Sequence, residues 1–337
     1  MKKYYVGYIT SNYLHTMRDD QAKKLTHLNL AFAPMVGDIT VMVLEDKDIR
    51  ELTRIKKANP ELQILVSTGG GGNRGHGEAT KTKAGMDKLV TSTMDIIHRY
   101  DLDGIDCDWE FPGDDGTVEE KYQHTALLAA YREELDKLGA QKNKKYWLTT
   151  AAGAGQWFID RTEIHKSHVY LDFINLMTYD SGICDYTSHH THLYEPAGGC
   201  TRPQSAHYNI ELLLNVGVPI EKMLIGMAFY SHQWDDVPDV NHGFFQKTEG
   251  GCLFGPNYTQ LMEIYKNDKS LVRYFDESAK APYLYNGGTF YTYDDEESIA
   301  YKVQYAKDRN MLGAFYWVHQ SDRDGILFDA IYNNLYK

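Results

Sequence analysis

Cysteine and long apolar runs are scarce in this sequence of 337 residues. The only four cysteines are Cys107, Cys184, Cys200 and Cys252, which are too few and too scattered for a disulfide scaffold. Because no C-x-x-C pair occurs, a metal or redox centre built on cysteine is not indicated either, and we expect free thiols. The sequence also lacks an apolar run of 18 residues and the apolar core of a signal peptide, so we expect a soluble chain and leave its export open.

Basic charge is also in short supply. Lys and Arg number 35 against 47 Asp and Glu, which gives a formal net charge of -12 without any basic block. Nucleic acids and anionic membranes would need a surface rich in Lys and Arg, so neither is expected as a partner. No motif indicates a cofactor or a metal, and we expect a monomer. Tyrosine is abundant, with 26 residues, and could either pack in a core or stack on the C–H faces of sugar rings.

Short apolar segments alternate with helical ones along the chain. Nearly continuous apolar runs are typical of parallel strands that are buried on both faces. We predict strands at Tyr4–Ile9, His27–Ala33, Gln63–Ser67, Gly104–Glu110, Trp147–Ala151, Phe173–Tyr179, Met223–Phe229 and Leu312–Trp317. We predict helices between them, for example at Asp46–Ala58, Thr80–Tyr100, Glu119–Leu138 and Glu296–Arg309. Eight alternating units predict an α/β protein with a closed (β/α)8 TIM barrel.

The stretch between the seventh and eighth predicted strands is too long for a single connecting helix. It carries Gly250-Gly251, Gly287-Gly288 and many aromatic residues. Because a structureless loop of this length is uncommon in a compact protein, we predict a small inserted α+β subdomain at residues 232–291. The catalytic barrel would then comprise residues 1–231 and 292–337.

The most informative segment is Asp103-Gly104-Ile105-Asp106-Cys107-Asp108-Trp109-Glu110. Side chains at i, i+2 and i+4 of a strand share one face, so Asp106, Asp108 and Glu110 should point together into the barrel mouth. The residues between them would face the outer helices. Three carboxyl groups at this spacing cannot all ionise cheaply, so their pKa values should separate and protons should be shared.

Glu110 comes last in this row of acids, nearest the carboxyl end of its strand, where the active sites of such barrels lie. It is therefore the natural proton donor of the three. A metal cage or a solvated edge strand would be the alternative. An edge strand would not carry such an apolar set on its other face, and a metal-dependent barrel enzyme would need carboxylates at the ends of several strands.

The acidic segment resembles the D-G-x-D-x-D-W-E signature of the family 18 glycoside hydrolases, which include the chitinases. Further motifs follow in that family's order. They are Leu25-Thr26-His27-Leu28-Asn29-Leu30-Ala31-Phe32 on the second strand, Ser67-Thr68-Gly69-Gly70 on the third, Met177-Thr178-Tyr179-Asp180 on the sixth and Gly313-Ala314-Phe315-Tyr316-Trp317 on the eighth. The resemblance spans nearly the whole chain, and many members carry an α+β insertion where the long stretch occurs here.

The resemblance implies a retaining, substrate-assisted glycosidase that cuts bonds to N-acetylglucosamine. Glu110 would protonate the departing glycosidic oxygen and later act as a base toward water. The nucleophile would be the carbonyl oxygen of the substrate's own 2-acetamido group, which Asp108 would orient. Asp106 would hold Asp108 and share its proton, and the Tyr179 hydroxyl would steady the acetamido oxygen. Taken alone, Tyr179 would be interpreted as a hydrogen-bonded core residue.

The resemblance also implies substrate-binding residues around the same rim. Asp180 would contact the sugar, and Trp317 would form the floor beneath it. Gly70 would leave room for the substrate. The other members of this set are Met177, Tyr8, Phe32 and Tyr230.

Some features depart from the family pattern. Where the family often has Tyr-Gly-Arg after the seventh strand, this chain has Tyr230-Ser231-His232, and His232 could either titrate near neutral pH or simply be solvated. The glycine-rich loop at residues 69–77 lacks the aromatic residue that many chitinases place there. It does not indicate a phosphate cradle, because no Lys-Ser/Thr follows and no helix is expected to begin at once. We interpret His189, His190 and His192 as a polar loop rather than a metal site.

The sequence therefore predicts hydrolysis of β-1,4-linked N-acetylglucosamine polymers or oligomers, chitin or chitooligosaccharides, without a cofactor. One alternative is an endo-β-N-acetylglucosaminidase that acts on N-glycans. Another is a non-catalytic, sugar-binding relative. The Met-x-Tyr-Asp motif and the insertion favour the chitinase, and Glu110 argues against the lectin because such lectins typically lose this acid.

Overall fold

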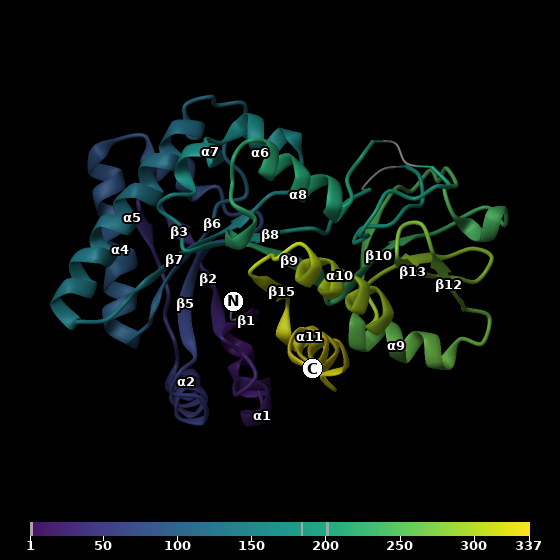
Figure 1. Cartoon of the computed structure of the whole chain (residues 1–337), viewed down its shortest axis with the longest axis horizontal. Coiled ribbons are helices and arrows are strands. Elements are labelled where there is room, and N and C mark those ends of the chain that lie inside the picture. Colours follow the sequence, from purple (N-terminus) through teal and green to yellow (C-terminus); the bar gives the residue numbers. More distant parts are fainter. Residues whose placement is uncertain (1–2, 183–184, 200–201) are drawn as a thin grey trace.

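The computed structural model of the chain describes residues 3–182, 185–199 and 202–337. Eight parallel strands close into a barrel in the order β1-β15-β9-β8-β7-β6-β5-β2. The barrel strands are β1 (Tyr4–Thr10), β2 (His27–Ala33), β5 (Gln63–Gly69), β6 (Gly104–Asp108), β7 (Trp147–Ala152), β8 (Phe173–Leu176), β9 (Met223–Ala228) and β15 (Gly313–Trp317). Helices alternate with these strands, which confirms the predicted (β/α)8 barrel (Figure 1).

The helices outside the long insertion surround the barrel. They are α1 (Asp19–Ala22), α2 (Asp46–Ala58), α3 (Gly75–Thr80), α4 (Lys83–Tyr100), α5 (Glu120–Lys142), α6 (Gln156–Arg161), α7 (Ile164–Ser167), α8 (Ala206–Asn215), α10 (Glu296–Asp308) and α11 (Ile326–Tyr336). A two-stranded ribbon of β3 (Met35–Val36) and β4 (Ile39–Thr40) follows β2. In the part of the chain that the structure describes, no helix is long and apolar enough to cross a bilayer.

A second sheet lies between β9 and β15 in the sequence, to the right of the barrel in Figure 1. It has the order β11-β10-β14-β13-β12, and its strands pair antiparallel. Its elements are β10 (Tyr230–Trp234), β11 (Leu253–Asn257), α9 (Tyr258–Asn267), β12 (Val272–Asp276), β13 (Ala281–Tyr285) and β14 (Phe290–Thr292). Trp234, Phe244 and Phe290 form part of a separate buried cluster. The division at residues 232–291 stays a prediction, and this separate core supports it.

Two strands, β6 and β8, end at least two residues earlier than the sequence pattern predicts. The prediction that β6 reaches Glu110 is wrong, because its ladder with β7 ends at the pair Cys107–Thr150 and its ladder with β5 at Gly69–Asp108. The same holds for β8, which ends at Leu176, before Met177 and Tyr179. The last catalytic candidates therefore lie on the loops that follow the strands, as is usual at the carboxyl face of such barrels.

The helix predicted at Thr80–Tyr100 is two helices. Thr82 has an extended backbone, and its side chain accepts a hydrogen bond from the Gly85 amide, which caps α4. The preceding helix α3 begins at Gly75, inside the glycine-rich loop, so the expectation that no helix begins there is wrong.

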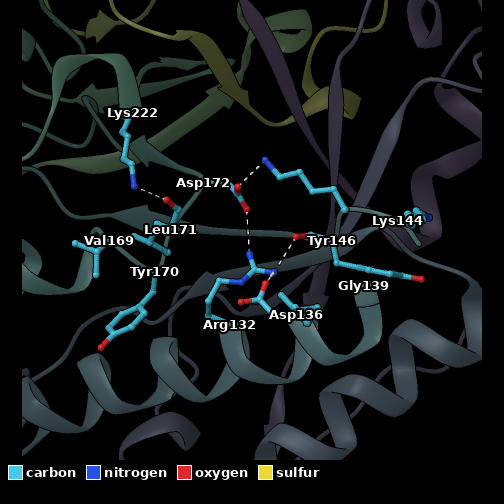
Figure 2. Close-up of a pocket in the computed structure, with 12 residues that line it drawn as sticks. Arg132, Asp136, Gly139, Lys144, Tyr146, Val169, Tyr170, Leu171, Asp172 and Lys222 are labelled. Atoms are coloured by element: carbon cyan, nitrogen blue, oxygen red, sulfur yellow. Dashed lines mark hydrogen bonds and ion pairs between the residues drawn. The ribbon is translucent and has the colours of Figure 1, made fainter. Parts of the chain in front are cut away.

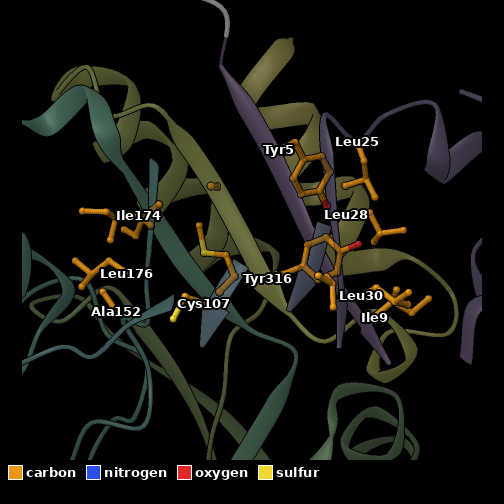
Figure 3. Packing of buried hydrophobic residues seen from close by; sticks show 14 of the residues in the cluster. Tyr5, Ile9, Leu25, Leu28, Leu30, Cys107, Ala152, Ile174, Leu176 and Tyr316 are labelled. Carbon is orange, nitrogen blue, oxygen red and sulfur yellow. The ribbon is translucent and has the colours of Figure 1, made fainter. Parts of the chain in front are cut away.

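Two apolar layers pack against the barrel sheet, one on its outer side and one in its interior. Ile105, Cys107 and Trp109 join the large cluster between the sheet and the helices, part of which Figure 3 shows, as the alternation along β6 predicts. Cys107 has a free thiol, as expected, whereas Cys184 and Cys200 lie outside the described residues. A smaller cluster that includes Val6 and Phe315 fills the barrel interior. The outer layer thus holds the odd-numbered side chains of β6 and leaves its acids facing inward.

Two buried histidines enclose Trp109 on the outer side of the acidic strand. The His76 ring stacks on the indole at 5.1 Å, and His124 meets it edge-on at 5.8 Å. Burial lowers the pKa of His76 to about 3, with a smaller contribution from His124, and lowers that of His124 to about 4. Both side chains are therefore neutral in the folded protein at neutral pH.

We expect the free energy of unfolding to fall as the pH decreases from about 6.5 to about 4. Over this range the histidines take up protons in the unfolded chain but stay neutral in the folded protein. Each such histidine contributes up to about 1.4 kcal/mol per pH unit to the slope of the unfolding free energy. Urea unfolding at pH 7 and pH 5 measures this slope. His124→Phe should reduce this slope by the contribution of about one proton, because one histidine fewer is protonated on unfolding. His98→Gln, on the exposed face of α4, should leave the slope unchanged. Equal slopes in wild type and His124→Phe would contradict the explanation.

Candidate active site

A cavity of about 250 Å³ opens where the barrel strands end. Residues from loops after β5, β6 and β8 line it, together with residues of β1, β2, β6, β7, β10, β11 and β15. The lining residues are Tyr8, Phe32, Gly71, Asp108, Glu110, Ala151, Met177, Tyr179, Asp180, Tyr230, Phe254 and Trp317. The structure thus brings together nearly every residue that the sequence singled out. Glu110 points into the same cavity as Tyr179 and Trp317 and away from the outer helices.

Asp106 lies beneath this cavity, fully buried, and each of its carboxylate oxygens accepts two hydrogen bonds. Tyr8 Oη and Ser67 Oγ donate to Oδ2, each at 2.8 Å. Thr149 Oγ1 at 2.6 Å and Asn175 Nδ2 at 3.3 Å donate to Oδ1. Burial raises the pKa of Asp106, and these donors oppose the rise. They come from β1, β5, β7 and β8, so four strands hold this one side chain.

Asp108 and Glu110 form the upper part of the row of acids and interact with each other. Burial raises the pKa of Asp108 well above its ordinary value, and the charges of Glu110 and Asp106 add to the rise. Burial and then the charge of Asp180 raise the pKa of Glu110 to about 7, while a hydrogen bond from Asp108 opposes the rise. Asp108 therefore carries a proton that it donates toward Glu110, and Glu110 itself titrates near neutrality.

One carboxyl oxygen of Asp108 lacks a hydrogen-bond donor. Asp108 Oδ1 is buried and has no hydrogen-bond partner among the residues that the structure describes. A buried acceptor without a donor costs free energy, so a ligand that brings an N–H or O–H group to this oxygen is favoured.

Asp180 lies at the rim, with 38% of its side chain exposed. Its Oδ1 accepts hydrogen bonds from Tyr230 Oη at 2.5 Å and from His232 Nε2 at 2.8 Å, and His190 Nδ1 lies 3.8 Å away. Burial favours the neutral acid, but His190 and His232 outweigh it, so the pKa of Asp180 lies below its ordinary value. Asp180 is therefore ionised, and hydrogen bonds from Tyr230 and His232 hold its carboxylate in place.

The histidines are buried, although the sequence left solvation open. His232 is 1% exposed, so its interpretation as a solvated residue is wrong. His189, His190 and His192 do lie in an irregular segment, but all three are buried. Ligand atoms of Asp180, His190 and His232 lie within 4.8 Å of one another, near enough for a metal. However, the imidazoles of His190 and His232 stack nearly parallel at 4.3 Å, so their lone pairs run side by side instead of converging.

Aromatic rings form one wall of the cavity. Phe32 stacks on Trp317 at 5.1 Å, and Tyr8 meets Trp317 edge-on at 5.7 Å. A glycine is needed at position 70, behind this wall, because a Cβ atom there would lie 2.6 Å from the Phe32 ring. Gly70 therefore makes room for Phe32, and its neighbour Gly71 lines the cavity instead.

A second cavity, of about 300 Å³, adjoins the first on the far side of Glu110. The two share Glu110, Met177, Tyr179 and Asp180. The residues that line only the second cavity are Phe111, Gly153, Ala154, Trp157, Ser181, Arg202 and Gln204. A ligand that extends through both cavities would pass directly over the carboxyl group of Glu110.

A larger cavity, of about 540 Å³, lies elsewhere, beside α5 and the segments that lead into β7 and β8 (Figure 2). Its charged groups pair with one another: Arg132 Nη1 and Lys145 Nζ lie 3.3 Å and 2.7 Å from the two oxygens of Asp172. Lys222 Nζ donates to the Leu171 carbonyl at 2.7 Å. Because these residues precede the strands, the cavity lies at the end of the barrel opposite Glu110. Its network ties α5 to the barrel and supplies no catalytic group.

The sequence matches Glycosyl hydrolases family 18 over residues 4–322. The chain belongs to this family. Its members hydrolyse glycosidic bonds, so the barrel is that of a glycosidase.

Relatives support this assignment. Chitinase A1 of Niallia circulans is 34% identical over 304 residues, which cover 83% of this chain and 43% of that protein. Chitotriosidase-1 of Mus musculus is 29% identical over 329 residues, which cover 90% of this chain and 68% of that protein. The solved structure of a glycoside hydrolase family 18 N-acetylglucosaminidase from Paenibacillus barengoltzii is 41% identical with a TM-score of 0.95, and the match covers 99% of this chain and 100% of that one.

This family 18 site contains residues that sequence reasoning missed. Thr149 and Asn175 bind Asp106 from β7 and β8, and each is a polar residue in a largely apolar strand, a signal that was available. Trp157 and Phe254 come from α6 and β11, and no local pattern distinguishes them from packing residues. Of the two, Phe254 is the stronger candidate for ligand binding, because it lines the first cavity although it is 75% exposed.

We expect Phe254→Ala to raise KM several-fold with little change in kcat, because an exposed ring at a cavity mouth contributes mainly to binding. Steady-state kinetics on a soluble oligosaccharide substrate measures both constants. Leu253→Ala is the matched control, since Leu253 is also exposed, at 49%, and does not line the cavity. A KM that is the same in both variants would exclude Phe254 from the binding site.

Proposed function

We propose that this protein hydrolyses β-1,4 bonds between N-acetylglucosamine units, in chitooligosaccharides or chitin, with Glu110 as acid and base. The observation that supports this most is the position of Glu110 between two adjoining cavities, with a pKa raised to about 7. A carboxyl group that still holds its proton near neutral pH can protonate a glycosidic oxygen placed over it. The named activities of the relatives, chitinase and N-acetylglucosaminidase, agree with this substrate class.

The first step would break the bond between the anomeric carbon and the glycosidic oxygen. Glu110 gives its proton to that oxygen, and the leaving sugar departs into the cavity lined by Trp157. The 2-acetamido carbonyl oxygen attacks the anomeric carbon and closes an oxazolinium ring, which carries the positive charge. Water then adds to the anomeric carbon while Glu110 takes back a proton, so the anomeric configuration is retained.

Asp108 and Tyr179 would hold the acetamido group in this step. The unpartnered Asp108 Oδ1 suits an acetamido N–H, which would satisfy the buried acceptor. Burial raises the pKa of Tyr179 well above its ordinary value, so its hydroxyl keeps its proton and can donate to the acetamido oxygen. Since four donors already occupy the oxygens of Asp106, this residue would act on Asp108 mainly through its negative charge, which favours the protonated form of Asp108.

Release of single N-acetylglucosamine units is a second candidate activity. The cavity with Asp108, Tyr179 and Trp317 measures about 250 Å³, at the small end of ligand pockets, which fits one sugar ring better than several. The Paenibacillus barengoltzii structure is that of an N-acetylglucosaminidase. In this case the same chemistry would act on the last sugar of a chain.

Glu110→Gln should lower kcat/KM on a chitooligosaccharide at least about a hundredfold, because the amide cannot donate the proton that leaves with the sugar. In the wild type, kcat/KM should fall as the pH rises above about 7, where Glu110 loses that proton. Glu119→Gln changes an exposed acid nearby and is the control for both measurements. Near-normal turnover by Glu110→Gln would remove Glu110 from this role, and binding without turnover by the wild type would favour the lectin.

A panel of three substrates distinguishes the remaining candidate activities. We expect cleavage of chitohexaose and no cleavage of cellohexaose, because a glucose unit lacks the 2-acetamido group that serves as the nucleophile. A high-mannose glycopeptide should stay intact, and its cleavage would favour the endo-β-N-acetylglucosaminidase. Chromatography of early products distinguishes the two candidates: mixed oligosaccharides indicate internal cleavage, and N-acetylglucosamine alone indicates release from chain ends.

A further inference from the structure

A fully buried ion pair joins helix α10 to the end of the second sheet. Neither Lys302 of α10 nor Asp294, two residues after β14, has any exposed side-chain area. Lys302 Nζ lies 2.6 Å and 2.8 Å from the two carboxylate oxygens of Asp294. The same carboxylate accepts hydrogen bonds from Ser298 Oγ at 2.7 Å and from the Ala228 amide at 3.2 Å. Buried charges need such bonds, so the chain around them has little freedom.

Thr191 completes this cluster from a different part of the chain. Its hydroxyl accepts a hydrogen bond from Lys302 Nζ at 2.6 Å and donates one to Asp294 Oδ2 at 2.8 Å. Thr191 is fully buried and belongs to the irregular segment after β8. Because the hydroxyl binds both members of the ion pair, it determines where this segment lies.

The residue before Thr191 lies against Asp180. The His190 carbonyl accepts a hydrogen bond at 3.0 Å from the amide of Ser181, the residue after Asp180, and His190 Nδ1 lies 3.8 Å from Asp180 Oδ1. Asp180 has a φ angle of 57°, in the left-handed region that favours glycine. Such a backbone persists only where its surroundings hold it. The bond between His190 and Ser181 is part of that hold, and it requires Thr191 to stay in place.

Asp294 reaches Asp180 by a second route as well. Ala228, whose amide donates to Asp294 Oδ2, is the last residue of β9. Two residues later, Tyr230 Oη donates to Asp180 Oδ1 at 2.5 Å. The buried ion pair therefore fixes both of the chain segments that meet at the rim carboxylate.

We propose that Thr191 is a positioning residue for the reaction: its hydroxyl, held by the buried ion pair, keeps Asp180 in the place where it binds the sugar. This inference rests on the proposed function, in which the substrate passes along the two cavities that Asp180 and Glu110 share. Thr191 lines neither cavity. Its effect on the reaction must therefore pass through Asp180, and removal of the hydroxyl should add nothing once the Asp180 carboxylate has been replaced.

A double-mutant cycle on kcat/KM for chitohexaose tests this dependence. Thr191→Val, which keeps the shape and removes the hydroxyl, should lower kcat/KM about three- to tenfold. Asp180→Asn should lower it about tenfold or more, because the substrate loses a charged hydrogen-bond acceptor. The double variant should match Asp180→Asn within about twofold. Losses that multiply would show that Thr191 does not act through Asp180 and would overturn the inference.

Two further variants distinguish positioning from general stability. Thr191→Ser retains the hydroxyl and should keep kcat/KM within about twofold of the wild type, although the lost methyl group lowers stability. Thr187→Val is the matched control, since Thr187 is also fully buried in this segment but its hydroxyl donates to the Gly243 carbonyl. It should leave kcat/KM nearly unchanged. A loss in Thr191→Ser or in Thr187→Val as large as that in Thr191→Val would mean a merely structural role and would also overturn the inference.

A crystal structure of Thr191→Val gives a readout that does not depend on turnover. The Asp180 carboxylate should be displaced, so that its Oδ1 loses the hydrogen bond from Tyr230 Oη or from His232 Nε2. An unmoved carboxylate would overturn the inference and leave the proposed function intact. Circular dichroism checks that each variant is folded, and Thr191→Ala, which also lacks the hydroxyl, replaces Thr191→Val if the latter does not fold.

Failure of the proposed function would have a different signature. It would appear as a wild-type protein that leaves chitohexaose intact or as an active Glu110→Gln variant. The crystal structure would then still decide whether Thr191 positions Asp180.

Discussion

The structure depends on the burial of one ionisable side chain, Asp106, at the centre of a closed barrel. A carboxyl group removed from water is costly unless donors surround it. Here the hydroxyls of Tyr8, Ser67 and Thr149 and the amide of Asn175 supply them. The same four bonds join strands β1, β5, β7 and β8 across the barrel, so the fold and the acid chemistry share their central contacts. The two acids above Asp106 then differ in pKa according to their depth and their neighbours.

The second sheet belongs to this chemistry as much as the barrel does. Its strand β10 carries Tyr230 and His232, which anchor Asp180, and β11 adds Phe254 to the cavity wall. Removal of the insertion would therefore take away part of the rim as well as a separate core. Asp106 at the barrel centre is fixed by hydrogen bonds within the barrel, whereas Asp180 at the rim is fixed by side chains of the second sheet.

The parts that could be predicted from the sequence are those with a local signal. Alternation along a strand places Asp106, Asp108 and Glu110 on one side and Ile105 on the other, and the eight apolar segments predict the barrel. Strand ends escaped prediction because a ladder stops where its neighbours stop, which no single segment encodes. The pairing of His232 with Asp180 joins residues 52 positions apart on separate elements, so the sequence could raise His232 as a candidate without showing its partner or its burial.

Asp108 Oδ1, the buried oxygen without a donor, has a consequence for selectivity. The folded protein already bears the desolvation penalty of this atom, and a sugar that cannot offer an N–H group there leaves the penalty in place. A site with a buried polar atom that must be hydrogen-bonded discriminates strongly against ligands without the matching group. Apolar pockets discriminate by shape far more weakly. Rejection of plain glucosides would then be a property of the unliganded protein, fixed by its own polarity before any sugar arrives.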